Sequence, residues 1–198
     1  MKLKPKAILF DMDGVLVDSL DSWWSSLNSA LEAYNYKPIS REEFIKKYWG
    51  HDLFDNIKRM KLSLEVGKFC NNVYGDHTDR IKIYKETKDT LEKLSKYKKA
   101  IITNTPKDCA VQILKQFDIE KYFEFVMTSD DVSKAKPDPE IVLKACKRLK
   151  VEPKDVVLVG DTDSDVKAGR NAGCSVIGLG IKADFCIDNL SEITDLLI

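Results

Sequence analysis

The sequence predicts an α/β protein built on a doubly wound parallel sheet, with an inserted α-helical domain. Three observations predict it: short apolar runs of strand length, helical patterns between them, and one long stretch without a strand. The apolar runs are rich in Val, Ile, Leu and Phe, as expected of parallel strands buried on both faces. They cover residues 6–10, 99–103, 124–128, 155–160 and 175–179.

Helical patterns separate most of these runs. Apolar residues recur at helical spacing over residues 87–97, 108–117 and 139–149. Strands that alternate with helices form parallel pairs joined by helical crossovers. This order therefore predicts one sheet with helices on both faces.

The stretch between the first two strand-like runs has no strand of its own. Its first part shows one apolar helical face, formed by Leu20, Trp23, Trp24, Leu27, Leu31 and Tyr34. Shorter helical segments follow around residues 44–49, 53–60 and 64–74. A crossover between parallel strands needs only about a dozen residues or slightly more. The excess predicts a helical bundle over residues 20–82, inserted into an α/β core formed by 1–19 and 83–198.

The first predicted strand leads into two carboxylates, Asp11 and Asp13, followed by Gly14. Side chains alternate along a strand, so both carboxylates would point the same way if the strand continued, and the glycine lets the backbone turn around them. Carboxylates held this close repel each other and need a cation, a shared proton or separate chemical tasks. All three outcomes indicate a functional site. The competing interpretation is a strand whose exposed end happens to be acidic.

Two further segments carry groups that bind anions. The predicted strand at 99–103 ends in Thr103 and Asn104, whose hydroxyl and amide groups can donate hydrogen bonds to a phosphoryl oxygen. Such residues are also common in ordinary turns and caps. Lys136 precedes a proline that disfavours helical geometry at the lysine, and a helix is expected to begin near Pro139. An arbitrary lysine is more often a solvated surface charge.

The fourth segment is acidic. The apolar run at 155–160 is followed by Asp161, Asp163 and Asp165, beyond the carboxyl end of the predicted strand. An acidic cluster at this place suits a hard divalent cation. Capping of the next helix by Asp163 or Ser164 is the competing interpretation, but it does not account for so many carboxylates.

In this order, the four segments resemble the haloacid dehalogenase superfamily, in particular its phosphatase branch, which includes phosphoglycolate phosphatases and β-phosphoglucomutases. The likeness begins at Ala7 and extends through residues 165–174 to 183–184 and 187–190. Each motif is common by itself, but four in this order and spacing are specific. The resemblance implies a Rossmann-like core in which the helical insertion is a cap that closes over the active site.

By this resemblance, Asp11 is a nucleophile that attacks the phosphorus of a bound monoester and becomes an aspartyl phosphate. Asp13 is then the general acid for the departing alkoxide and the general base for the incoming water. Because phosphate monoesters hydrolyse extremely slowly without a catalyst, division into two covalent steps is favourable. The two carboxylates differ in task because metal holds one ionised while the other can carry a proton.

The resemblance also implies a Mg²⁺ site. The side chains of Asp11 and Asp161 and the backbone carbonyl of Asp13 would bind the ion with phosphate and water oxygens, an all-oxygen set appropriate to Mg²⁺. Asp165 would support this set from outside. The phosphoryl oxygens of the substrate would be held by Thr103, Asn104 and Lys136.

The cap would then select the remainder of the ester. Candidate substrate-facing residues near its linkers are Asp18, Ser19, Arg41, Trp49 and His51. For the tryptophans of the insertion, burial in the cap core is the favoured interpretation. Arg41 lies in a helix-start pattern, so a solvated position explains it as well as substrate contact does.

The composition favours a small-molecule partner. Thirty-two basic residues balance thirty-two acidic ones, which leaves no electrostatic footprint for nucleic acid, and no apolar run approaches transmembrane length. The first apolar run is short and enters the acidic motif directly, so we do not expect a signal peptide. Five widely spaced cysteines fit reduced thiols. We expect a cytoplasmic monomer or weak homodimer that binds a small-molecule phosphate ester, and neither nucleic acid nor a membrane.

Three functions remain open. The favoured one is a Mg²⁺-dependent phosphatase that hydrolyses a small-molecule monoester such as phosphoglycolate or a sugar phosphate. The alternative is a phosphosugar mutase of the β-phosphoglucomutase type, which would use the same Asp11 and Asp13 but retain a bisphosphate intermediate instead of admitting water. A noncatalytic phosphate-binding protein is disfavoured, because every catalytic position carries a competent residue.

Overall fold

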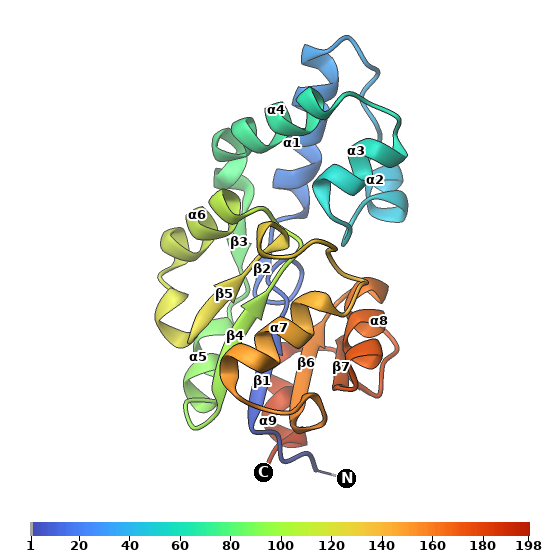
Figure 1. The fold of residues 1–198 in the computed structure, drawn as a ribbon. Coiled ribbons are helices and arrows are strands. Elements are labelled where there is room, and N and C mark those ends of the chain that lie inside the picture. Colours follow the sequence, from blue (N-terminus) through green and yellow to red (C-terminus); the bar gives the residue numbers. More distant parts are fainter. Residues whose placement is uncertain (1) are drawn as a thin grey trace.

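The computed structural model describes residues 2–198, which form a six-stranded sheet with helices on both faces (Figure 1). The strand order is β5-β4-β1-β6-β7-β8, and every neighbouring pair is parallel. From β1 the chain adds β4 and β5 on one side and the other three strands on the other side, as a doubly wound sheet requires. The strands are β1 (Ala7–Phe10), β4 (Lys98–Ile102), β5 (Phe125–Met127), β6 (Val156–Gly160), β7 (Ser175–Leu179) and β8 (Phe185–Ile187).

Alternation along β1 divides the core into two apolar layers. Ala7 and Leu9 belong to one layer, whereas Ile8 and Phe10 belong to the other, and all four side chains are fully buried. The first layer is covered by α7 (Glu140–Leu149) and α8 (Asp163–Ala172). The second is covered by α5 (Thr87–Lys93), α6 (Lys107–Phe117) and α9 (Ile193–Leu196).

The residues between β1 and β4 include a helical segment, residues 20–80, which lies beyond the carboxyl ends of the strands at the top of Figure 1. Trp23, Leu27 and Leu31 of its first helix are buried, as the predicted apolar face requires. Its helices are α1 (Leu20–Ala33), α2 (Arg41–Lys47), α3 (Leu53–Arg59) and α4 (Leu64–Val73), followed by a 3-10 helix over Tyr74–Arg80.

The chain enters and leaves the helical segment at one place. The entering strand β2 (Val17–Asp18) pairs antiparallel with the departing strand β3 (Lys82–Ile83). Thr87 reinforces this junction, because its hydroxyl donates to the carbonyl of Leu16 at 2.9 Å. The two linkers therefore form a two-stranded ribbon.

Side-chain caps fix the starts of the three short helices α2, α3 and α4. The oxygens of Ser40, Asp52 and Ser63 each accept a hydrogen bond from a backbone N–H two or three residues further on. A cap of this kind contributes about 1 kcal/mol, because it satisfies an N–H that has no partner inside the helix.

The shortest strands are not predicted from the sequence. The five predicted strands are all present within about one residue at each end, but β2, β3 and β8 were not predicted. Each of these has two or three residues, which is too few for a periodic pattern to appear. Of the three residues of β8, only Ile187 is buried.

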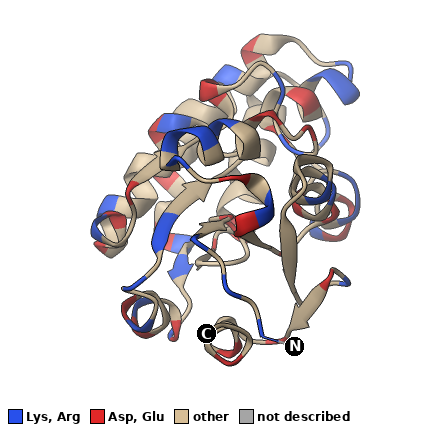
Figure 2. Cartoon of the chain, turned by 60° about the horizontal axis from the view of Figure 1, so that its bottom comes forward, with Lys and Arg blue, Asp and Glu red and all other residues tan. Residues whose placement is uncertain are grey.

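The surface carries charges of both signs. In the view of Figure 2, basic and acidic residues are interspersed along the helices. The five cysteines are free thiols, four of them buried. Among the helices of residues 2–198, none combines the length and apolar character needed to cross a membrane.

Leu158 lies in the middle of β6 and is fully buried, so its replacement tests the contribution of the core to stability. We expect Leu158→Ala to lower the free energy of unfolding by about 2–5 kcal/mol, through lost burial and the cavity left behind. Leu143→Ala is the matched control, since Leu143 on α7 is 44% exposed and should change stability by no more than about 0.5 kcal/mol. Urea unfolding followed by circular dichroism measures both, and equal effects would contradict this assignment of the core.

Candidate active site

Three adjacent strands bring predicted site residues to one edge of the sheet. The neighbours β4, β1 and β6 continue directly into Thr103, Asp11 and Asp161. Carboxyl ends of parallel strands meet at the same edge, so residues far apart in sequence become neighbours. The backbone N–H of Asp11 donates to the carbonyl of Val159 at 2.9 Å, which fixes Asp11 immediately beyond β1.

A buried lysine holds two of the carboxylates. Lys136 Nζ lies 2.9 Å from Asp11 Oδ1 and 2.6 Å from Asp165 Oδ1, and it donates to the carbonyl of Ile102 at 3.1 Å. The lysine is 2% exposed, and Asp165 is fully buried. A buried ion pair requires complete hydrogen bonding, and the three N–H bonds of the ammonium have three acceptors here.

Asn104 positions this lysine. Its Oδ1 accepts from the N–H of Lys136 and its Nδ2 donates to the carbonyl of Lys136, both at 2.9 Å. This pair of bonds fixes the backbone of Lys136 beside the end of β4. The sequence predicts Asn104 as a phosphoryl ligand, whereas in the structure its amide holds the residue that bears the ammonium.

The cluster has more negative than positive groups. Asp11, Asp161 and Asp165 each place a carboxylate oxygen within 4.8 Å of the others, against the single ammonium of Lys136. Burial, reinforced by the charge of Asp165, raises the pKa of Asp11 to about 7, although Lys136 opposes the rise. Burial disfavours the charged lysine, but Asp11 and Asp165 outweigh this effect and raise the pKa of Lys136. The lysine therefore stays protonated, and the carboxylates require further positive charge.

Asp161 fits a metal ligand. Its Oδ1 is buried and finds no hydrogen-bond partner within residues 2–198, while its Oδ2 accepts a long bond of 3.4 Å from Trp49 Nε1. Burial, reinforced by Asp11 and Asp165, raises the pKa of Asp161 well above its ordinary value. A hard divalent cation would satisfy both the free oxygen and the excess negative charge, and carboxylate oxygens are the ligands it prefers.

Gly14 lets the backbone turn beside Asp161. Its φ is +79°, and a Cβ at this position would lie 2.0 Å from Asp161 Oδ2. A side chain there would displace the carboxylate. Because β1 ends at Phe10, Asp11 and Asp13 do not continue a strand with parallel side chains, and the turn instead brings both to the lining of one cavity.

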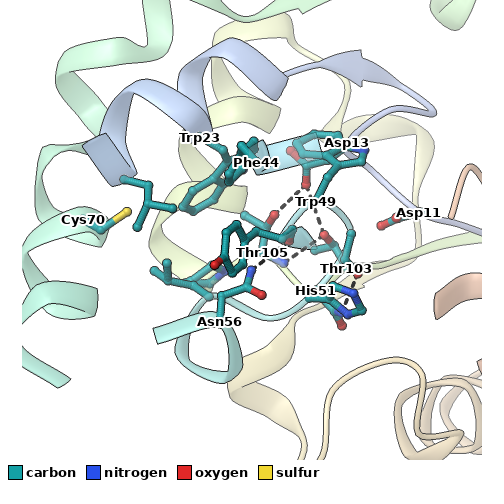
Figure 3. Close-up of a pocket in the computed structure, with 16 residues that line it drawn as sticks. Asp11, Asp13, Trp23, Phe44, Trp49, His51, Asn56, Cys70, Thr103 and Thr105 are labelled. Atoms are coloured by element: carbon teal, nitrogen blue, oxygen red, sulfur yellow. Dashed lines mark hydrogen bonds between the residues drawn. The ribbon is translucent and has the colours of Figure 1, made fainter. Parts of the chain in front are cut away.

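Hydroxyl groups surround Asp13 (Figure 3). Thr105 Oγ1 donates to Asp13 Oδ2 at 2.5 Å, Thr103 Oγ1 donates to the same oxygen at 3.4 Å, and Ser19 Oγ donates to Oδ1. The sequence analysis did not assign Thr105 to the site. One signal was available: residues 103 and 105 share a side if the chain stays extended.

Asp165 joins the lysine to the start of α8. Its Oδ2 accepts from the N–H of Thr162 at 3.1 Å and from the hydroxyl of Thr162 at 2.6 Å. The expected N-caps, Asp163 and Ser164, are wrong, because Thr162 is the N-cap and the two residues are the first of the helix. Asp163 is exposed and lies outside the acidic cluster.

One loop of the helical segment reaches the sheet edge. It follows α2 and contains Trp49, which contacts Asp161, and Gly50, whose carbonyl accepts from Asn104 Nδ2 at 3.3 Å. A Cβ at Gly50 would lie 2.5 Å from Thr162 Cγ2, so the contact is close. This loop connects the helical segment to the acidic cluster.

The other candidates from the helical segment and its linkers differ in position. Arg41 pairs with Asp21 at 2.6 Å, and each side chain is 50% exposed, so this ion pair is on the surface. Asp18 is exposed on β2, whereas Ser19 is buried beside Asp13. His51 lines the cavity and is exposed on its other side.

A small cavity of about 60 Å³ lies between the sheet edge and the helical segment (Figure 3). The sheet edge contributes Asp11, Asp13, Thr103, Asn104, Thr105 and Pro106. The helical segment contributes apolar residues such as Trp23 and Phe44, together with Asn56. The arrangement can therefore hold a small molecule with one end against the carboxylates.

The chain is similar to known proteins over nearly its whole length. The chain is 28% identical to a protein named pyrophosphatase PpaX from Bacillus thuringiensis (strain Al Hakam), over 98% of this chain and 97% of the relative. A crystal structure described as a predicted phosphoglycolate phosphatase from Haemophilus somnus 129PT superimposes with a TM-score of 0.80, at 27% identity and 96% coverage of each chain. A Thermotoga maritima structure provisionally assigned as a β-phosphoglucomutase gives a TM-score of 0.71, at 27% identity and coverage of 96% and 97%.

The sheet and its acidic edge, with these relatives, define a hydrolase of the phosphatase class. A family model described as haloacid dehalogenase-like hydrolase matches residues 8–179, so the chain belongs to that family. This match confirms the resemblance predicted from the four motifs. The matched range includes β4 and β6, all of β1 except Ala7, and every residue of the acidic cluster.

The raised pKa of Asp161 predicts how the stability of the metal-free protein depends on pH. A carboxyl whose pKa is raised by folding stabilises the fold only while protonated, and that contribution is lost as pH rises through the folded pKa. With chelator, the wild type should therefore lose stability relative to Asp161→Asn as Asp161 ionises, by about 1–3 kcal/mol, and the two proteins are compared at about pH 8 and about pH 4. At about pH 4, near the ordinary pKa of a carboxyl, the difference should shrink.

Urea unfolding at both pH values measures this effect. Asp163→Asn is the matched control, because Asp163 is exposed and outside the cluster, and its stability should follow the wild type at both values. A loss of stability in Asp161→Asn at about pH 8 would show that the cluster is not short of positive charge.

Proposed function

We propose that the protein is a Mg²⁺-dependent phosphatase that hydrolyses a small-molecule phosphate monoester through an aspartyl phosphate on Asp11. The observation that carries the proposal is the cluster at the sheet edge: Asp11 held at 2.9 Å by buried Lys136, with Asp13 in the lining of the same cavity. A noncatalytic phosphate-binding protein would not need a second carboxylate at the place where the anion binds.

Asp11 is the proposed nucleophile. Its position immediately beyond β1 is fixed by the backbone bond to Val159, so its carboxylate needs little reorganisation before attack on phosphorus. The bond from Lys136 keeps the charged form available despite burial. In the first step, a carboxylate oxygen of Asp11 bonds to phosphorus and the bond to the ester oxygen breaks.

Asp13 is the proposed acid and base. It donates a proton to the departing alkoxide in the first step and takes one from the attacking water in the second. The hydroxyls of Thr105 and Ser19 orient its carboxyl group toward the cavity side of Asp11. The two aspartates thus have different surroundings, a lysine for one and hydroxyls for the other, which suits different protonation tasks.

The side chains of Asp11 and Asp161 and the backbone carbonyl of Asp13 are the proposed Mg²⁺ ligands. The free Oδ1 of Asp161 and the shortage of positive charge in the cluster support this choice. Asp165 would act from outside, since its two oxygens are occupied by Lys136 and Thr162. When bound, the ion supplies positive charge that offsets the phosphoryl oxygens.

Thr103, Asn104 and Lys136 are the proposed phosphoryl-binding residues. Lys136 supplies the charge, and Thr103 a hydroxyl next to Asp13. Asn104 contributes at least by fixing the lysine, because both ends of its amide bond to the backbone of Lys136.

Residues 20–82 are the proposed cap, and residues 1–19 and 83–198 the proposed catalytic core. Two observations support this division. The linkers β2 and β3 pair with each other, so the chain passes between the two parts at one junction. The loop that contains Trp49 contacts Asp161 of the acidic cluster. A cap of this kind excludes water during the first step and admits it for the second.

Replacing the nucleophile tests the mechanism. Asp11→Asn keeps the shape of the side chain but removes its nucleophilic oxygen, so turnover should fall by about 10³-fold or more while the circular dichroism spectrum stays the same. Release of inorganic phosphate from monoesters in the presence of Mg²⁺ measures turnover. Asp163→Asn, an exposed aspartate of the same chain, should keep wild-type turnover. Near wild-type phosphate release by Asp11→Asn would exclude the covalent mechanism.

Asp13 is tested by varying the leaving group. A general acid matters most when the departing oxygen is strongly basic, so Asp13→Asn should lower kcat/KM for an alkyl phosphate by about 10²–10⁴-fold. The loss should be much smaller for p-nitrophenyl phosphate, whose phenolate leaves without a proton. Because kcat/KM covers steps up to the first irreversible one, it isolates the transfer to Asp11 from the hydrolysis that follows. Equal losses for both esters would remove Asp13 from the role of acid.

A further inference from the structure

Part of the wall that the helical segment contributes to the cavity is apolar. Five of its side chains are at most 8% exposed and carry no charged group, namely Trp23, Leu27, Phe44, Leu53 and Cys70. They come from α1, α2, α3 and α4, so all four helices contribute. The polar half of the cavity belongs to the sheet edge, where the phosphoryl group is proposed to bind.

No positive charge faces this wall. Among the described residues that line the cavity, none is Lys or Arg. Burial, together with nearby Arg59, lowers the pKa of His51, which keeps its imidazole neutral near neutral pH. Burial raises the pKa of the Cys70 thiol to about 12, so this side chain is neutral too. A negatively charged group against the five apolar side chains would therefore find no lysine or arginine among the described residues that line the cavity.

Asn56 is one of the polar residues on this side of the cavity, together with Tyr48, Trp49 and His51. The residue is 5% exposed, and its Nδ2 donates to the carbonyl of Tyr48 at 2.8 Å, which fixes the orientation of the amide. Its Oδ1 is buried and has no hydrogen-bond partner in the described part of the chain. An unsatisfied buried acceptor is costly, so a ligand that donates a hydrogen bond here gains specificity.

We propose that the substrate is a small phosphate monoester whose leaving group is uncharged and mainly apolar, with a hydroxyl or N–H that donates to Asn56 Oδ1. This inference rests on the proposed phosphatase function and specifies the substrate class of the same site. The cavity has the proposed phosphoryl site at one end and these apolar side chains at the other, so it suits a compact leaving group.

The same wall argues against substrates that carry a second anion. The carboxylate of phosphoglycolate or the second phosphate of pyrophosphate would lose its hydration against apolar side chains, with no cation in return. A mutase that retains a bisphosphate intermediate meets the same obstacle, because its second phosphate would face this wall. The chain thus differs in substrate from what the names of its relatives state for those proteins.

A panel of four substrates tests the proposal on the Mg²⁺-loaded protein. The panel contains 3-hydroxypropyl phosphate, butyl phosphate of nearly the same size, phosphoglycolate and pyrophosphate. We expect kcat/KM to be highest for 3-hydroxypropyl phosphate, about tenfold or more above butyl phosphate, and higher for both than for the two compounds that carry a second anionic group. A preference for phosphoglycolate or pyrophosphate would overturn the substrate class and leave the phosphatase proposal intact. Hydrolysis of none of the four would overturn the phosphatase proposal itself.

Asn56→Leu tests the hydrogen bond, because leucine keeps the size of the side chain and removes the acceptor. The ratio of kcat/KM between 3-hydroxypropyl and butyl phosphate should fall from about tenfold to about one. A general disturbance of the loop would lower both values and leave the ratio unchanged, and that result would overturn the role of Asn56. Asn72→Leu is the matched control, since Asn72 is exposed on α4 outside the cavity, and it should keep the wild-type ratio.

A second variant keeps the proposal testable if Asn56→Leu fails to fold. Leu53 is the first residue of α3 and one of the buried side chains that line the cavity, so a lysine there would bring an ammonium to the apolar wall. Leu53→Lys should raise kcat/KM for phosphoglycolate relative to butyl phosphate by about tenfold, because it supplies the missing cation. An unchanged ratio in a folded Leu53→Lys protein would show that the charge of the wall does not select the substrate.

Discussion

The buried ammonium of Lys136 is the interaction on which the site depends. It is shared by Asp11 and Asp165 at 2.9 and 2.6 Å, and without it three carboxylates would be left within 4.8 Å of each other in a poorly hydrated place. Removing one partner of a buried ion pair commonly costs several kcal/mol, because the other charge stays behind. Loss of the lysine would disturb the whole sheet edge. Asp165 also bonds to Thr162 at the start of α8, and Asn104 bonds to the backbone of Lys136.

The acidic cluster lacks at least one positive charge, and this deficit favours the binding of a cation. A site that was already neutral would gain little from binding a cation or from approaching a phosphoryl group through that cation. Here the unpaired oxygen of Asp161 and the raised pKa values of Asp11 and Asp161 favour the uptake of a divalent ion. The same electrostatics that lower the stability of the empty fold prepare it for its ligand.

Most of the core could be predicted from the sequence, because its strands are long enough to show apolar runs and its acidic residues follow them directly. Asp11, Thr103 and Asp161 were expected at strand ends, and parallel topology alone is enough to bring them together. The contact of Thr105 with Asp13 and the pairing of Asn104 with the lysine backbone were not predicted, because loop conformation decides them. Asn56 was missed for another reason: its exposure to the cavity depends on how the short helices pack, which no periodic pattern records.

The ribbon of β2 and β3 has a mechanical consequence for the helices that it carries. Two strands joined side by side bend and twist more easily than they slide past each other, because sliding would break the pairing of Val17 with Ile83. Any displacement of the helical segment is therefore a swing about the ribbon, with both connections travelling together. Ser19 directly follows β2 and moves least in such a swing, whereas Trp49, on the loop after α2, is carried along with the helices. Asp13 thus keeps the hydroxyl of Ser19 beside it through such a swing, whereas Asp161 loses its contact with the indole of Trp49.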